Sequence, residues 1–138
     1  MKTYVYNLKT AYKDKVESTG NGYKISGKLS TELVNVSIKP GRLSQQQLIK
    51  KARKGIYIEK ISGTHAGLNP QSGNFSLIAS GYMIEEGQKG QPVALITVAG
   101  NVFDIFNDVL AVGRDVELQI DGYEVPSILI KEIAVSGK

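Results

Sequence analysis

The sequence predicts an α+β fold made mainly of antiparallel β-structure, a barrel-like or sandwiched sheet with two short helices. Several segments show the alternation of apolar and polar residues that is typical of half-buried strands. The 15 glycines against 4 prolines in 138 residues favour many tight turns, and hence short strands. The two helical segments, at about 44–54 and 101–112, do not alternate with strands as in a parallel βαβ fold. The length is close to the common domain size, so we expect residues 1–138 to form a single domain.

The N-terminal part predicts a turn and two strands. Thr19–Gly22 contains an Asn-Gly pair and predicts the turn, and strands are expected at Tyr23–Ile25 and Leu33–Lys39. Gly22–Lys28 matches the first seven positions of a phosphate loop, but Leu29 follows where that loop needs a Ser or Thr. The next segment also predicts a strand rather than a helix, so a glycine-punctuated hairpin explains the pattern better than a nucleotide site.

The first helix is predicted by its own end signals. Ser44 is a suitable N-cap, and Gln47 stands three residues later, as in a capping box. Leu48, Ile49 and Ala52 form one apolar face. On the opposite side lie four basic residues, which predict a solvated helix face and, as the weaker alternative, a contact surface: Lys50, Lys51, Arg53 and Lys54.

The second helix is predicted to begin at Asn101, a good N-cap, and to end before Gly113. Its expected buried face consists of Val102, Phe103, Phe106, Val109 and Leu110.

Between and after the two predicted helices, the sequence predicts mainly strands. A strand is expected at residues 56–61, followed by a long loop from Gly63 to Gly73. Residues 75–85 and 91–99 flank a glycine turn and predict a β-hairpin. The last predicted strands are 115–120 and 127–135.

Composition excludes several kinds of site. There is no Cys, so disulfides, thiolate metal sites and thiol nucleophiles are excluded. With one His, the chain alone cannot build a multi-histidine metal site. The net charge of +4 permits only weak attraction to polyanions. No apolar run is long enough to cross a bilayer and the N-terminus has no apolar signal region, so we expect a soluble, cytoplasmic protein without a membrane partner.

His65 lies in the long glycine-rich loop. A structural loop histidine is the main interpretation, a binding-site wall is the second, and a catalytic role is the weakest. Ser62, Ser72 and Ser76 are near in sequence, but no nucleophile-elbow pattern accompanies them.

Residues 55–113 carry a set of spaced motifs that resembles the C-terminal domain of the TldD/PmbA family, also called modulator of DNA gyrase. The matching elements are the Gly63–Asn69 loop with its Asn-Pro, Gly73–Ser76, Ala79–Tyr82, Ile84–Gly87, Pro92–Val93, Ala99–Asn101 and Ala111–Asp115. Flanking matches are Ser18–Asn21, Ser127–Ile130 and Val135–Gly137. The resemblance runs nearly end to end and corresponds to the C-terminal third of a PmbA/TldE-type protein.

The resemblance implies a two-subunit zinc metallopeptidase that cleaves unfolded peptides and matures peptide antibiotics. In that family the TldD-like subunit holds zinc through an HExxxH helix and a C-terminal Cys, and the PmbA (TldE) subunit lacks these ligands. This chain has no HExxxH and no Cys around Ile120–Gly122, and its Pro126–Gly137 ending is PmbA-like. We therefore expect a non-catalytic subunit domain that holds no metal, is inactive alone, and pairs with a zinc-bearing TldD-like subunit. Two alternatives remain: a regulatory module that binds DNA gyrase or DNA, as the family's older name suggests, and a complete small hydrolase that uses His65.

Unfolded peptides bind without sequence specificity by adding a strand to an exposed sheet edge. The strand at residues 75–85 is the expected edge, and a glycine within it leaves room for close backbone approach. The expected peptide-binding residues are His65, Asn69, Asn74, Phe75, Ser76, Ser80 and Gly81. Exposed edges at Thr3–Leu8 and Ser127–Val135 also predict a homodimer of the isolated chain.

Overall fold

The computed structural model describes residues 5–32, 37–118 and 124–137 of the chain. It contains two compact units: one comprises Met1–Ile38 and Leu118–Val125, the other Lys39–Glu117 and Pro126–Lys138. Each unit is described by itself below, and the expectation of one domain stays a prediction. Within these described ranges, no helix is both long and apolar enough to cross a membrane.

The first unit is built on helix α1 (Leu8–Asp14) and the hairpin of β1 (Gly22–Ile25) and β2 (Lys28–Thr31). The hairpin turn has positive φ at two consecutive positions, 46° and 83°, as a two-residue turn requires. The phosphate-loop look-alike is therefore a hairpin, as the sequence predicts.

Helix α1 was not predicted, because the segment before it was expected to be an edge strand. Asn7 caps the helix by accepting a hydrogen bond from the Thr10 N–H at 3.0 Å. The same side chain is 4% exposed and donates to the Ser30 carbonyl and the Thr31 hydroxyl on β2. One buried amide thus joins α1 to the hairpin.

Two further strands, β7 (Glu117–Leu118) and β8 (Glu124–Val125), pair with each other. Ser37 forms a parallel bridge with Glu124. Most of the strand expected at residues 33–39 and the turn expected at 121–122 lie outside the described residues.

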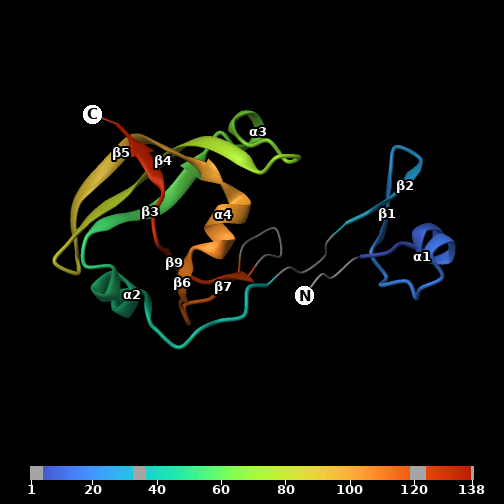
Figure 1. Ribbon diagram of the computed structural model, residues 1–138, viewed down its shortest axis with the longest axis horizontal. Helices are drawn as coiled ribbons and strands as arrows, with labels where there is room; N and C mark the ends of the chain where they lie inside the picture. The colour runs from blue at the N-terminus through green and yellow to red at the C-terminus, as the bar shows by residue number, and fades with distance from the viewer. Residues whose placement is uncertain (1–4, 33–36, 119–123, 138) are drawn as a thin grey trace. The chain divides into compact units, whose positions relative to one another are not determined.

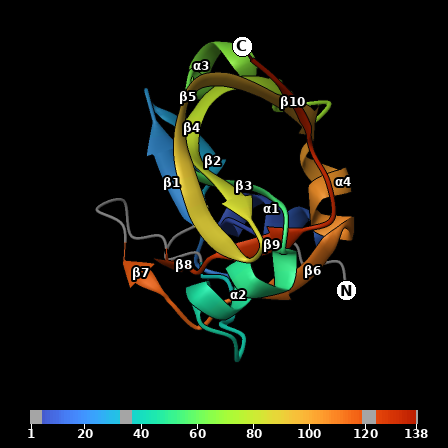
Figure 2. The same cartoon turned by 90° about the vertical axis from the view of Figure 1, so that its left-hand side faces the viewer.

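The second unit contains a four-stranded antiparallel sheet in the order β10-β5-β4-β3 (Figure 1). Its strands are β3 (Gly55–Ser62), β4 (Asn74–Glu85), β5 (Gln88–Asn101) and β10 (Ala134–Ser136). The predicted hairpin is confirmed as β4 and β5, and its turn again has two positive φ values, 51° and 77°. Register shifts in the pairing of β4 with β3 and β5 mark bulges, and β4 and β5 curve strongly (Figure 2). The α+β class dominated by antiparallel structure is confirmed.

The core of this unit lies on one face of the β4–β5 hairpin. Alternate residues of the two strands point to it and are at most 9% exposed: Phe75, Leu77, Ala79, Ile96 and Val98. Partly buried side chains from the neighbouring elements pack against them, among them Val102 and Ile105.

Helix α2 (Gln45–Ala52) forms as predicted. Ser44 and Gln47 make both hydrogen bonds of the capping box, and Leu48 and Ile49 are 4% and 7% exposed. The Gly87 N–H donates to the Arg53 carbonyl at 2.9 Å, so the end of α2 holds the hairpin turn.

The second predicted helix is half as long as expected. Helix α4 (Val102–Asn107) begins at the predicted Asn101 cap, but the chain then turns into strand β6 (Val109–Val112). Strand β6 pairs with β9 (Ile128–Ile130), which satisfies backbone groups that the rest of a helix would have satisfied. The expected single strand at 127–135 is accordingly divided into β9 and β10.

The buried face predicted for the 101–112 helix is also wrong in part. Phe103, Phe106 and Leu110 are 61%, 63% and 54% exposed.

Candidate functional site

The loop between β3 and β4 forms the wall of a hollow in the surface of the second unit. The loop contains the short helix α3 (Thr64–Gly67), which begins after Gly63. The hollow has a volume of about 650 Å³ and is lined by Ala66, Gly67, Leu68, Asn69, Pro70, Gln71, Asn74, Phe75 and Ser76.

Asn69 gives the loop its shape. Its Oδ1 accepts hydrogen bonds from the N–H groups of Gln71 and Ser72 at 2.9 and 3.1 Å. Its backbone accepts from Gly73 and donates to Asn74, both at 2.8 Å. Asn followed by Pro is a strong turn signal, because the amide oxygen replaces a backbone acceptor two residues on. The side chain expected to contact a peptide is therefore partly used to fold the hollow.

Asn101 fastens this loop to α4. Its Oδ1 caps the helix by accepting from the Phe103 N–H at 2.9 Å, and its Nδ2 donates to Ser72 O at 2.9 Å and Asn74 Oδ1 at 2.7 Å. The cap was predicted, but the two contacts across the loop were missed. Gly73 also lies at this contact between the loop and α4, because a Cβ there would lie 2.9 Å from the ring of Phe103.

The structure brings four of the seven predicted site residues together at the hollow: Asn69, Asn74, Phe75 and Ser76. Of these, Phe75 belongs to the core and Asn74 Oδ1 is held by Asn101. Ser76 is exposed on β4 and takes part in neither arrangement. His65 is exposed on α3 and is not among the lining residues.

Ser80 and Gly81 lie farther along β4, away from the hollow. Gly81 is buried, and a Cβ on it would collide with the Tyr57 carbonyl of β3 and lie 3.1 Å from the Glu59 nitrogen. The space that the sequence assigns to an approaching peptide is thus filled by β3 itself.

The expected peptide edge is also corrected. From Ile78 to Ile84, strand β4 pairs with β3 on one side and β5 on the other. The outer strands of the described sheet are β3 and β10. The edge nearest the hollow is that of β3, because Ser62 leads directly into Gly63 and α3.

A second polar cluster was missed by the sequence analysis. The Ser127 hydroxyl and N–H both donate to Asp115 Oδ2, and Gln45 Nε2 donates to the Ser127 hydroxyl at 3.3 Å. Gln45 also donates to the Tyr57 hydroxyl at 3.0 Å, and Lys89 Nζ lies 3.8 Å from the centre of the Tyr57 ring. Its members are too far apart in sequence, up to 82 positions, for a local motif to reveal them.

Neither cluster fits a zinc ion. The sequence holds one His and no Cys, and the part of the chain that the structure describes contains no group of three His, Asp or Glu side chains placed to hold a metal. The two groups of polar residues instead have structural roles. The hydrogen bonds of Asn69 and Asn101 hold the loop beside the hollow, and the second polar cluster joins α2, β3 and the chain before β9.

Comparison with known proteins identifies the fold. The family model of the PmbA/TldA metallopeptidase C-terminal domain matches residues 1–137. The chain belongs to this family. The resemblance drawn from the motifs is thereby confirmed, and the family relates the chain to metallopeptidases.

The curated relatives are much longer than this chain. The metalloprotease PmbA homolog of Buchnera aphidicola subsp. Acyrthosiphon pisum is 31% identical over 137 residues, which are 99% of this chain and 28% of the relative. A metalloprotease of Methanocaldococcus jannaschii is 32% identical over 133 residues, 91% of this chain and 29% of the relative. The chain therefore spans less than a third of these relatives.

Two solved structures share the fold. A candidate modulator of DNA gyrase from Thermotoga maritima has a TM-score of 0.89 and 39% identity, covering 99% of this chain and 31% of that one. TldE from Thermococcus kodakarensis has a TM-score of 0.86 and 26% identity, with the same two coverages.

Proposed function

We propose that this chain is the C-terminal domain of a PmbA/TldE-like, non-catalytic subunit that works with a zinc-bearing TldD-like subunit on unfolded peptides. Its part is to form one wall of the peptide path and to contact the catalytic subunit. The observation that carries the proposal is family membership over residues 1–137, in a chain whose donor set does not fit zinc.

The non-catalytic role is supported by the residue inventory. Zinc of the TldD type would need ligands that one His and no Cys cannot supply. His65, the one imidazole, is exposed on α3, and no member of the second polar cluster is a histidine. Any zinc chemistry is therefore assigned to the TldD-like subunit and not to this chain.

The peptide path is assigned to the hollow and the adjoining edge of β3. The hollow offers a floor partly made by Leu68, Pro70 and Phe75, with amide and hydroxyl groups around it. Such a mixture binds chains of varied sequence, because apolar side chains find contact area and the backbone finds hydrogen-bond partners. The outer edge of β3 supplies the strand pairing that β4 does not offer.

Binding can be tested with a fluorescein-labelled peptide that has no stable structure, measured by fluorescence anisotropy. Ser76→Arg places a long side chain in the hollow without touching the core, so we expect its affinity to fall by about tenfold or more. Ser136→Arg is the matched control, since Ser136 is an exposed strand serine outside the hollow. No binding by the unmodified chain, or equal loss in both variants, contradicts the assignment of the peptide path.

The subunit role has its own test. A TldD-like subunit from the same genome, mixed with this chain, is expected to form a complex in which all zinc belongs to the TldD-like subunit. Zinc analysis of the separated subunits and size-exclusion chromatography of the mixture measure both points. A complex that appears only with a longer PmbA-type protein would show that the docking surface lies outside this chain.

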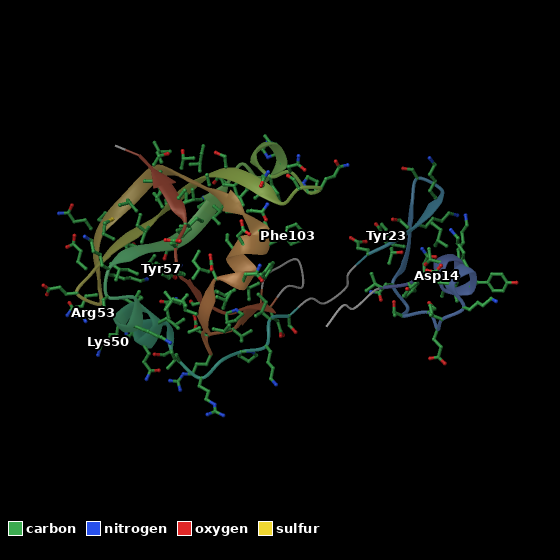
Figure 3. All side chains as sticks on the ribbon, viewed as in Figure 1. Asp14, Tyr23, Lys50, Arg53, Tyr57 and Phe103 are labelled. Atoms are coloured by element: carbon green, nitrogen blue, oxygen red, sulfur yellow. The ribbon has the colours of Figure 1, made fainter. Side chains whose placement is uncertain are left out.

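A second candidate function is a module that binds DNA gyrase or DNA. The observation that favours it is the basic group on and after α2, in which Lys50, Lys51, Arg53 and Lys54 are all exposed; Lys50 and Arg53 are labelled in Figure 3. Phosphate binding by this group predicts a DNA affinity that falls steeply with salt. Charge reversal at Lys50 and Lys51 that leaves the affinity unchanged would rule out this surface.

A further inference from the structure

Helix α1 and the β1–β2 hairpin border a small apolar hollow in the first unit, here called the α1–hairpin hollow. Its volume is about 350 Å³, at the lower end of the range of about 300–1,000 Å³ that small-molecule sites have. Leu8, Tyr23 and Leu29 line it and are 77%, 48% and 50% exposed. Tyr23 is labelled on the hairpin in Figure 3. Three large apolar side chains at one hollow are thus open to solvent.

The pairing of the hairpin explains why the hollow is open. Lys24 stands directly opposite Leu29, and Gly22 lies on the same face two residues earlier. Thr31 is opposite Gly22 and accepts a hydrogen bond from the buried Asn7 side chain, so this face is turned toward the start of α1. A Cβ on Gly22 would meet Asn7 Cβ at 3.4 Å and Leu29 Cδ1 at 3.9 Å, which are ordinary contacts. A larger side chain at position 22 would therefore enter the hollow.

The α1–hairpin hollow carries a positive charge. Of the described residues that line it, only Lys24 is charged, and its side chain is exposed. In the described part of the chain, Lys24 forms no ion pair with Glu17, which precedes the lining residue Ser18. The other described acids of this unit do not line the hollow either: Asp14, Glu32 and Glu124. A ligand complementary to this hollow therefore combines an apolar group with a negative charge.

Main-chain groups also line the hollow, at Gly20 and Gly22. Gly20 has a φ of 75°, and a Cβ there would have no atom within 4 Å. The Ser18 hydroxyl holds this segment, because it accepts from the Gly20 N–H at 3.3 Å and donates to the Tyr6 carbonyl at 3.2 Å. Glycine lets another backbone approach closely, since it has no side chain. A ligand with a main chain of its own, a peptide, fits this wall better than a bare apolar acid.

We propose that the α1–hairpin hollow binds the C-terminal residue of a peptide that ends in a large apolar side chain. That side chain enters the hollow between Leu8 and Leu29, and the terminal carboxylate pairs with the Lys24 ammonium group. The last peptide group lies against Gly20 and Gly22. The site belongs to the first unit alone, so it goes beyond the peptide path proposed in the second unit and does not rest on it.

Titration of the ¹⁵N-labelled chain with short peptides, followed by its amide NMR signals, tests the site. The probe is N-acetyl-Gly-Gly-Phe with a free C-terminal carboxylate, which should shift the signals of Gly20, Gly22 and Lys24. The same peptide with a C-terminal amide should bind about threefold to fivefold more weakly at low salt, as expected for an exposed ion pair. N-acetyl-Gly-Gly-Ser should bind about tenfold more weakly, because it buries little apolar area. Hexanoate has no peptide group and should bind at least about fivefold more weakly.

Two substitutions separate the parts of the contact. Lys24→Ala should abolish the preference for the carboxylate peptide over the amide. Lys13→Ala, which removes an exposed lysine of α1 outside the hollow, should leave that preference unchanged. Gly22→Leu should weaken the binding of both peptides at least about tenfold, because the leucine fills the hollow. Gly90→Leu is its matched control, since Gly90 is a strand glycine of the second unit that also has room for a Cβ.

The proposal is overturned if the amide peptide or hexanoate binds as tightly as the carboxylate peptide, or if millimolar peptide shifts none of the three signals. It is equally overturned if Ser76→Arg removes the binding, because the peptide then occupies the hollow of the second unit instead. Far-UV circular dichroism shows whether each variant folds. If Gly22→Leu does not fold, Lys24→Ala decides, and an unchanged preference for the carboxylate peptide in that variant contradicts the proposal.

Discussion

Replacement of Gly81 by Ala should destabilise the second unit strongly, although it adds one methyl group. Gly81 is buried in β4 beside the bulge of β3, where the register shifts between Ile58 and Lys60. A Cβ at this position would collide with the Tyr57 carbonyl oxygen and lie 2.9 Å from its carbonyl carbon and 3.1 Å from the Glu59 nitrogen. All three atoms are backbone, so no side-chain rotation can relieve the contact. The two strands must move apart at the bulge.

The size of the effect follows from these contacts. Forcing a methyl group into a filled site costs about 1–3 kcal/mol, and a lengthened ladder hydrogen bond costs about 1 kcal/mol more. We therefore expect a loss of about 3 kcal/mol in the free energy of unfolding. Unfolding entropy amounts to about 0.3 kcal/mol/K for 138 residues, so the melting temperature should fall by about 10 °C.

Gly90→Ala is the matched control in the partner strand of the same hairpin. A Cβ on Gly90 would have its nearest neighbour, the Met83 carbonyl oxygen, at an ordinary distance of 3.6 Å. Its melting temperature should match that of the unmodified chain or lie slightly above it, because alanine restricts the unfolded state. Thermal melts followed by far-UV circular dichroism measure both variants. Equal melting temperatures for the two variants would refute the close approach of β3 to Gly81.

Three further outcomes are expected. Asn101→Ala should lower stability by about 2 kcal/mol, because it removes the cap on the Phe103 N–H and two contacts to the loop; a chemical denaturation midpoint equal to that of the unmodified chain would contradict this. Gly100→Val should lower the melting temperature more than His65→Ala, since a Cβ on Gly100 lies 3.1 Å from the Phe75 ring whereas His65 is exposed; the reverse order would contradict the packing. The purified chain should bind no stoichiometric zinc and cleave no peptide, and about one zinc per chain that His65→Ala abolishes would overturn this expectation.

The elements that the sequence predicts well are those with local end signals. Helix α2 follows from Ser44 and Gln47, whose side chains make the capping box within four residues. The β4–β5 hairpin follows from Gly87 between two alternating segments. In both cases the residues that decide the structure are neighbours in the sequence.

The prediction failed for the second half of the 101–112 helix, because the structure of that segment depends on a partner strand that is distant in the sequence. Val109–Val112 has an apolar pattern that suits a helix face, but its residues also have high strand propensity. Pairing with Ile128–Ile130 decides in favour of a strand, and that partner follows many residues later. Helix α1 was missed for a related reason: Asn7 is a cap, yet the tyrosines and valine before it suggested a strand.

The candidate-site residues likewise fall into two groups: those that hold the fold together and those that only line the hollow. Only a substitution in the second group can test peptide binding without damaging the fold. Asn69 and Asn74 were chosen as surface polar residues, but their oxygens hold the loop together through backbone groups and Asn101. Phe75 supports the core from the same wall. Loss of peptide binding in variants of these three residues would not separate a damaged fold from a damaged surface. Ser76 faces the hollow without a part in either arrangement, so its substitution reports on binding itself.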